Sequence, residues 1–407
     1  MHIDLTENGD PIEVEIPAAV GILLRASGLV TAAPSLEPGW WTVGPAGKVG
    51  VARVGSLEIW VAPKLVIRRL FFLMGYARDL RAWRDEDLGL REDADLVTAI
   101  ATAFARQADR ATQQGLLQGY RVEETSSPVV RGKIRTADQV RHRYGIAVPV
   151  EIRYDEYGVD IPENQLLRGA AAVLLQLGGL DLLTRKSLLR LVRATADVTP
   201  LRRGVPLPSW QPSRLNARYQ LALHLAELVL RGGSVEQAPG STQISGFMLD
   251  MAALYEDFLT VALGMSLTRA GGICRPQDRW HLDEADSVPM RPDLVWYAAG
   301  SSDPTAVVDA KYKAEKPSGF PNADLYQMLA YCSVMGLPRG HLVYAKGNEP
   351  ATTHVFRRTG IEVTQHTLDL DQDPADLLAQ VDHLATSIAV ASAPAGPSPG
   401  SRSELAM

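Results

Sequence analysis

Two carboxylates and a lysine stand at positions from which a β-sheet would bring them together. Asp293 follows Pro292 in one strand-like run, and Asp309 and Lys311 lie in the next such run, sixteen residues further along the chain. Side chains alternate between the two faces of a strand, so Asp309 and Lys311 point to one face while Ala310 points to the other. If the two runs are neighbouring strands, the three charged side chains converge at one rim of the sheet.

This combination of side chains suits the hydrolysis of phosphodiesters. Carboxylate oxygens are the ligands that hard cations such as Mg²⁺ prefer, and Mn²⁺ takes the same ligands. A bound cation polarises the phosphate and lowers the pKa of a water molecule, while a neighbouring lysine neutralises the charge that builds up on the phosphate. We therefore predict an Mg²⁺ site, with Mn²⁺ as a substitute, in which Asp293 and Asp309 bind the metal and Lys311 assists catalysis.

Two flanking helices offer three more candidate site residues. Glu256 is an acid inside an otherwise apolar helical segment, and we predict it as a third metal ligand and catalytic residue; an exposed helix acid is the alternative. Gln327 and Tyr331 are four residues apart, so they share one helix face and are predicted to join the catalytic set, unless they serve only helix packing. Asp309 follows the apolar run 306–308, and a charge in such a buried strand is rarely tolerated without a function.

These residues lie in a stretch whose hydrophobic pattern switches between helix and strand periods. Helix, paired strands, helix and further strands follow one another, which is the order of an α/β domain, here predicted with a mixed sheet over residues 241–390. The predicted helices are Phe247–Leu263, Ala323–Met335 and Ala375–Ile388, and the predicted strands are 290–298, 305–313, 339–347 and 351–358.

Two other modules are predicted before this domain, and a tail after it, so the fold class is multidomain α+β. Residues 1–145 form a β-rich module with a long helix, and residues 146–240 a helical module with basic character. Residues 391–407 are rich in proline, serine and glycine, so we expect a disordered tail. The predicted strands of the first module are Ile12–Ile16, 47–55 and 56–63, and the predicted helices of the two modules are 91–118, 160–177, 182–194 and 215–230.

The 41 basic and 47 acidic residues of the 407-residue chain give a formal charge of −6, but the charges are segregated. Residues 131–231 hold 16 Lys and Arg against 9 Asp and Glu, a net of +7, which leaves −13 for the rest. Such a basic middle indicates either a surface that contacts phosphates or a set of solvated helix faces. A strongly basic nucleic-acid coat protein is excluded, whereas a local basic groove is not.

Several other function classes have no support in the sequence. With only two cysteines, Cys274 and Cys332, the chain cannot build a disulfide framework or a cysteine-based zinc site. No signal peptide and no apolar stretch of membrane-spanning length is visible, so we expect a cytoplasmic protein with no membrane partner. Residues 44–50 resemble a phosphate loop but lack its first glycine and its serine or threonine, so we expect no nucleotide-driven motor in this chain.

The Pro-Asp and Asp-x-Lys runs resemble the PD-(D/E)xK nuclease superfamily, and the Gln-x-x-x-Tyr spacing within Tyr326–Tyr331 is similar to its RecB-like branch. Other segments narrow the resemblance to the McrC family, the nuclease subunits of McrBC modification-dependent restriction systems. The segments similar to that family's motifs are 55–65, 71–77, Val130–Ile134, Pro162–Leu167 and Phe247–Glu256. The resemblance runs in order over residues 50–350 and is most specific in the nuclease part.

The resemblance implies a C-terminal PD-(D/E)xK nuclease core and a Mg²⁺-dependent endodeoxyribonuclease activity in anti-phage defence. The family's two metal-binding acids and its lysine correspond to Asp293, Asp309 and Lys311. McrC-like proteins associate with an McrB-like AAA+ GTPase ring, stimulate it through their N-terminal part, and cut double-stranded DNA, modified or not. The resemblance therefore implies that residues 1–145 dock such a ring, and that this chain cuts DNA when the ring licenses it.

Two other functions stay open on the sequence alone. A self-sufficient RecB-like repair nuclease would bind DNA through its basic middle, and its affinity would fall steeply as salt is added. A non-catalytic regulator of an NTPase would not need the complete set of Asp293, Asp309 and Lys311. The intact set therefore favours a nuclease over a regulator.

Overall fold

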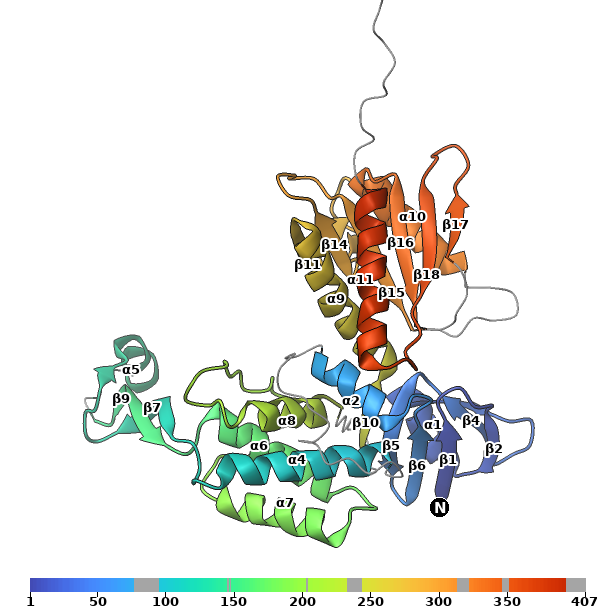
Figure 1. The fold of residues 1–407 in the computed structure, drawn as a ribbon. Coiled ribbons are helices and arrows are strands. Elements are labelled where there is room, and N and C mark those ends of the chain that lie inside the picture. Colours follow the sequence, from blue (N-terminus) through green and yellow to red (C-terminus); the bar gives the residue numbers. More distant parts are fainter. Residues whose placement is uncertain are drawn as a thin grey trace, which may run out of the picture. The chain divides into compact units, whose positions relative to one another are not determined.

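The computed structural model describes residues 1–76, 95–144, 146, 148–202, 204–232, 244–312, 322–345 and 351–392 (Figure 1). The chain forms two compact units. The first unit comprises residues 1–67 and 81–249, and the second comprises residues 68–80 and 250–407. None of the helices in the described residues is long and apolar enough to cross a membrane. Of the predicted disordered tail, 391–407, residues 393–407 lie outside the described part, whereas Ala391 is the last residue of a helix.

Two small sheets form the β part of the first unit. One has the order β1 (His2–Thr6), β6 (Leu57–Ala62), β5 (Lys48–Val54) and β10 (Ile244–Asp250). The other has the order β2 (Ile12–Glu15), β4 (Trp40–Pro45) and β3 (Val30–Pro34), with helix α1 (Ala18–Ser27) packed on β3. Buried side chains alternate along β6, as they do in a strand with one face on a core. The three strands predicted near the N-terminus are therefore confirmed.

Strand β10 corrects the prediction of a helix that begins at Phe247. Residues 244–250 pair with β5 instead, and helix α9 (Met251–Ala270) begins after Asp250. The carboxylate of Asp250 caps this helix by accepting hydrogen bonds from the backbone N–H groups two and three residues further on. An apolar run as short as Phe247–Leu249 has no periodicity that distinguishes a strand from a helix. The pairing with β5 in the folded chain therefore determines that it is a strand.

Glycine at position 50 lets β5 and β10 approach each other. Gly50 has a φ of +134°, and a Cβ atom there would overlap the carbonyl oxygen of Phe247. We expect Gly50→Ala to lower the free energy of unfolding by about 2–4 kcal/mol, because it adds both backbone strain and a clash with backbone.

Gly28→Ala is the matched control for this prediction. Gly28 also has a positive φ, +60°, but no described atom lies within 4 Å of the added Cβ. We expect Gly28→Ala to lower the free energy of unfolding by only about 1 kcal/mol, which is the cost of the left-handed conformation alone. Denaturant unfolding measures the stability of both variants. Equal losses of unfolding free energy would show that the close contact of Gly50 with β10 is unimportant.

A group of helices completes the main body of the first unit. They pack against one another and are α4 (Leu96–Thr112), α6 (Pro162–Leu175), α7 (Leu182–Ala194) and α8 (Gln220–Gly232). The predictions for α6 and α7 are confirmed, with Pro162 in the first turn of α6 and Asp181 capping α7. Residues 91–94, the predicted start of α4, lie outside the described residues.

The predictions for α4 and α8 were each wrong at one end. Helix α4 ends at Thr112, six residues earlier than predicted, and Gly115 with a φ of +90° follows it in a conformation that a helix cannot continue. Helix α8 begins at Gln220, five residues later than predicted. Before it, the side chain of Asn216 accepts a 2.8 Å hydrogen bond from the backbone of Ser213 and holds a turn.

A three-stranded antiparallel sheet in the first unit was not predicted. Strand β9 (Val150–Gly158) pairs with β7 (Gly119–Ser127) on one side and with β8 (Lys133–Ile134) on the other, and α5 (Thr136–Arg143) follows β8. No residue of β7 is buried, and two of its large apolar side chains, Tyr120 and Val122, are exposed. Along β9, however, apolar Val150, Ile152 and Tyr154 alternate with charged Glu151, Arg153 and Asp155, a strand pattern that the prediction of a helical module from residue 146 overlooked.

The second unit contains a six-stranded mixed sheet. Its order is β11 (Ile273–Pro276), β14 (Leu294–Tyr297), β15 (Ala306–Lys311), β16 (Arg339–Tyr344), β18 (Glu362–Thr367) and β17 (Thr352–Val355). Strands β15, β16 and β18 are parallel, and the other neighbours are antiparallel. This confirms an α/β unit with a mixed sheet, although β11 and β18 were not predicted.

Helices cover both faces of this sheet. Helix α10 (Asn322–Met335) packs Met328 against Leu342 and Tyr344 on one face. Helix α9 packs on β14 and β15, and α11 (Pro374–Ala391) packs on α9; Figure 1 shows these two in front of the strands and α10 behind them. Helices α10 and α11 confirm the predicted helices. The remaining elements are α2 (Ile67–Tyr76), β12 (Trp280–His281) and β13 (Pro289–Met290).

Candidate active site

Strands β14 and β15 bring Asp293 and Asp309 together at one end of the mixed sheet. The strands are antiparallel, with Leu294 opposite Val308, so Asp293 at the start of β14 lies across from Asp309. Asp293 accepts a 2.7 Å hydrogen bond from the backbone N–H of Ala310, which fixes its carboxylate beside β15. The three residues before Asp309 are buried and hold β15 inside the sheet, so Asp309 itself is only 2% exposed.

A chain of polar contacts runs from Asp309 to helix α10. Lys311 forms an ion pair with Asp309, and its Nζ donates a 2.9 Å hydrogen bond to Oε1 of Gln327. Nε2 of Gln327 donates in turn to the hydroxyl oxygen of Tyr331 over 2.8 Å. Burial raises the pKa of Tyr331 to about 12, so its hydroxyl stays protonated at neutral pH. The helix thereby holds the Lys311 ammonium against Asp309.

Helix α9 brings Glu256 into the same cluster. The carboxyl group of Glu256 lies beside that of Asp293, and this contact raises the pKa of Asp293 while it opposes the rise in the pKa of Glu256. Nε2 of Gln277 donates to both of them, at 3.2 Å to Oδ1 of Asp293. Gln277 has a φ of +49°, which costs about 1 kcal/mol for a residue with a Cβ, and strain of this kind concentrates at functional sites.

Gln277 is the site residue that sequence reasoning missed. It follows Pro276, the last residue of β11, and belongs to no motif. Its backbone N–H also donates to the carbonyl oxygen of Asp293, over 3.2 Å, so the turn that it occupies is tied to the loop before β14. Its position depends on the pairing of β11 with β14, which the sequence pattern did not reveal.

Burial and neighbouring carboxylates raise the pKa values of the cluster. Burial is the largest cause and mutual repulsion adds to it; together they raise the pKa of Asp293 to about 7 and that of Asp309 to about 6. Burial likewise raises the pKa of Glu256. Lys311 opposes the rise at both aspartates. One ammonium group cannot balance three carboxylates, so the cluster either holds protons or attracts a further cation.

The donor set suits a hard divalent cation. Glu256, Asp293 and Asp309 offer only oxygen ligands, which Mg²⁺ prefers. As they stand, no group of three or more His, Cys, Asp or Glu side chains among the described residues has the geometry of a metal site. Asp309 faces Lys311, while Asp293 accepts hydrogen bonds from Gln277 and from the backbone N–H of Ala310. A cation bound by these carboxylates would favour their ionised forms and so release any proton that they hold.

The structure brings all six predicted site residues into one cluster, whereas their chemical roles stay predictions. Glu256 is partly buried and hydrogen-bonded rather than an exposed helix acid. Gln327 does more than pack its helix, because it contacts Lys311 directly. The six residues are Glu256, Asp293, Asp309, Lys311, Gln327 and Tyr331.

Comparisons with known proteins place this cluster in context. The profile of a family described as McrBC 5-methylcytosine restriction system component matches residues 45–345, a range that includes every residue of the cluster. The fold is similar to that of a chain in a refined half-complex from a tetradecameric assembly of Thermococcus gammatolerans McrB AAA+ hexamers with bound McrC. That match has a TM-score of 0.58 and 18% identity, and covers 95% of this chain and 100% of that chain.

A second solved structure, the Thermococcus gammatolerans McrBC complex, contains a chain that matches with a TM-score of 0.39 and 20% identity. This match covers 66% of this chain and 88% of that chain. A search of curated proteins finds no significant match.

Proposed function

Because the chain belongs to the family of McrBC 5-methylcytosine restriction system components, we propose that it is the nuclease subunit of such a system, a Mg²⁺-dependent endonuclease that cuts double-stranded DNA. The observation that carries this proposal is the cluster of three carboxylates and Lys311 at one end of the mixed sheet. An aspartate at the start of one strand and Asp-x-Lys in the next, with helices on both faces, is the arrangement expected of a PD-(D/E)xK core. We therefore include that core in the proposal, as the fold of the second unit.

The contacts suggest a role for each residue. When bound between the three carboxylates, Mg²⁺ would polarise the scissile phosphate and activate a water molecule. Lys311 lies beside Asp309 and is oriented by Gln327, so its ammonium can neutralise charge on the phosphate oxygens as the P–O bond breaks. Gln277 donates hydrogen bonds to two of the carboxylates and would keep them in place once both are ionised.

A ring-shaped partner completes the proposal. The Thermococcus gammatolerans half-complex contains McrB AAA+ hexamers with bound McrC. We propose that an McrB-like AAA+ GTPase ring likewise binds this chain, that residues 1–145 form the docking region and stimulate the GTPase, and that the ring licenses cleavage. Residues 44–50 support the proposal that the GTP-hydrolysing motor is a separate protein. This segment joins β4 to β5 and is not followed by a helix, whereas a true phosphate loop is.

The test is plasmid cleavage in Mg²⁺ by the purified chain, alone and together with its GTPase ring partner and GTP. We expect cutting only when the ring and GTP are both present, and faster GTP hydrolysis when the chain is added to the ring. Equal cutting by the chain alone would favour a self-sufficient repair nuclease. Stimulated GTP hydrolysis without any cutting would contradict the nuclease proposal and leave a regulatory role.

A further inference from the structure

A basic groove lies between helices α4 and α7 of the first unit and shares no residue with the candidate active site. The cavity has a volume of about 890 Å³. Its lining is mostly polar and strongly charged. The charged lining residues are Arg106, Asp109 and Arg110 from α4 and Lys186, Arg190 and Arg193 from α7.

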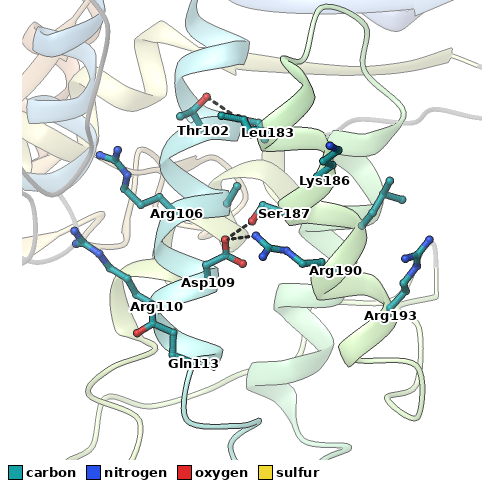
Figure 2. Close-up of a pocket in the computed structure, with 13 residues that line it drawn as sticks. Thr102, Arg106, Asp109, Arg110, Gln113, Leu183, Lys186, Ser187, Arg190 and Arg193 are labelled. Atoms are coloured by element: carbon teal, nitrogen blue, oxygen red, sulfur yellow. Dashed lines mark hydrogen bonds and ion pairs between the residues drawn. The ribbon is translucent and has the colours of Figure 1, made fainter.

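Both helices that line the basic groove carry positive charges. Figure 2 shows Arg106 and Arg110 extending from α4 on the side away from α7, Lys186 and Arg193 along α7, and Arg190 between the two helices. All five side chains are exposed to solvent. Five cations and one carboxylate make this a site for an anion that carries several charges.

The single carboxylate is occupied by contacts within the basic groove. Asp109 accepts a 2.6 Å hydrogen bond from the hydroxyl of Ser187 and forms a 3.1 Å ion pair with Arg190. Thr102 and Thr184 join the same two helices through a 3.2 Å hydrogen bond between their hydroxyls. These contacts tie α4 to α7 and position Arg190, so the surface that carries the charges is preorganised.

The spacing of the cations suits a polymer with regular negative charges. On α7, Lys186 and Arg190 are four residues apart and Arg193 follows three residues later, so all three lie on one helix face. Arg106 and Arg110 repeat the interval of four on α4. Four residues of helix advance about 6 Å. Every second phosphate of a B-DNA strand advances about 7 Å along the duplex axis.

We propose that the basic groove binds the sugar–phosphate backbone of double-stranded DNA without reading its sequence. The choice of DNA as the polyanion rests on the proposed nuclease function. Among the described lining residues there is no aromatic side chain on which a base could stack, so contact with backbone phosphates is favoured over contact with bases. An acidic protein partner is the less favoured ligand, because protein interfaces combine arginine anchors with aromatic ones, and the lining of the groove includes arginines but no aromatic side chain.

The test measures DNA binding separately from DNA cutting. In the full-length chain carrying Asp309→Asn, which prevents cleavage, Arg106, Lys186 and Arg193 are replaced together by Gln. Binding to a fluorescein-labelled 30-base-pair duplex of arbitrary sequence is followed by fluorescence anisotropy over a range of KCl concentrations. We expect affinity near 0.1 M salt to fall at least about tenfold, and the slope of log K against log salt to become shallower by about 2–3.

A second triple variant removes the same charge elsewhere on the first unit. Arg25, Arg53 and Arg141 are exposed on α1, β5 and α5, and their replacement by Gln should change the affinity by less than about threefold. Equal losses in the two triple variants would indicate bulk charge and overturn the proposal. Unchanged DNA binding combined with weaker binding to the GTPase ring would also overturn it, by making the basic groove a protein interface.

The proposed nuclease function and the proposed DNA binding by the basic groove can each be contradicted without contradicting the other. Anisotropy needs no cleavage, so the basic groove can bind DNA even if the chain proves not to be a nuclease. Conversely, if the groove triple variant binds DNA normally while the chain without Asp309→Asn still cuts, the groove proposal alone is wrong. Both triple variants keep Asp109, Ser187 and Arg190, and thermal unfolding near that of the parent would exclude misfolding as the cause of lost affinity.

Discussion

The Asp309→Asn variant is expected to cut DNA at least about 10³-fold more slowly than the wild-type chain when the GTPase ring and GTP are present. Asp309 is 2% exposed, forms the ion pair with Lys311 and lies across from Asp293. An amide carries no charge, so it binds a hard cation weakly and cannot form an ion pair with Lys311. The measurement is single-turnover cleavage of labelled DNA in excess Mg²⁺, which reports the chemical step rather than product release.

Two controls separate lost chemistry from lost structure. Asp303→Asn removes one carboxylate from the exposed loop between β14 and β15, and we expect cleavage within about twofold of the wild-type rate. Stimulation of the ring's GTP hydrolysis by the Asp309→Asn chain should be unchanged, because the fold and the docking region are intact. Normal cleavage by Asp309→Asn would show that the active-site assignment is wrong.

The second large expected effect is a decrease in the free energy of unfolding as pH rises. The pKa values of about 7 for Asp293 and about 6 for Asp309 both lie above the ordinary value of 3.8. Between 3.8 and these raised values, the folded state binds more protons than the unfolded state, so the free energy of unfolding decreases as pH rises. The stabilisation is present below about pH 4 and is lost as pH rises through about 7. Without metal, we expect the pair to contribute a loss on the order of 6 kcal/mol between pH 4 and pH 8.

Denaturant unfolding in EDTA at pH 5 and pH 8 measures this effect, and the variant Asp293→Asn isolates it. The amide cannot ionise, so the difference in stability between variant and wild type should shift in favour of the variant as pH rises. Mg²⁺ should reverse the loss in the wild-type chain at pH 8, with weaker binding at pH 5 because the cation competes with protons. A difference that is constant between the two pH values, or an unchanged stability on adding Mg²⁺, would contradict the assignment of Asp293 as a metal ligand.

The part of the candidate site that could be predicted depends on local geometry. Asp309 and Lys311 share a strand face because strand side chains alternate, and Gln327 contacts Tyr331 because helix residues four apart are neighbours. These relations hold wherever such a strand or helix forms. They do not require knowledge of what packs against it.

Features that depend on partners distant in sequence could not be predicted in the same way. The segment 244–250 has an apolar pattern compatible with a helix, and it is a strand because β5 offers it a free edge. Strand β7 has no buried residue and depends on β9 as its partner, although the apolar–polar alternation of residues 150–155 could have revealed β9 itself. Gln277 reaches Glu256 and Asp293 only because β11 pairs with β14.

The sequence by itself determined the chemistry that is available: a hard-ligand set at Asp293 and Asp309, a lysine on the same face, and an excess of positive charge in residues 131–231. The tertiary structure decided which carboxyl groups lie together and which charges share a surface. Glu256 meets Asp293 through the packing of α9 on β14, and α4, which lies outside the basic segment, supplies one side of the basic groove. The periodicity of a helix or strand relates residues that are only a few positions apart in the sequence. These contacts join residues that are tens of positions apart, so only the packing of whole elements can bring them together.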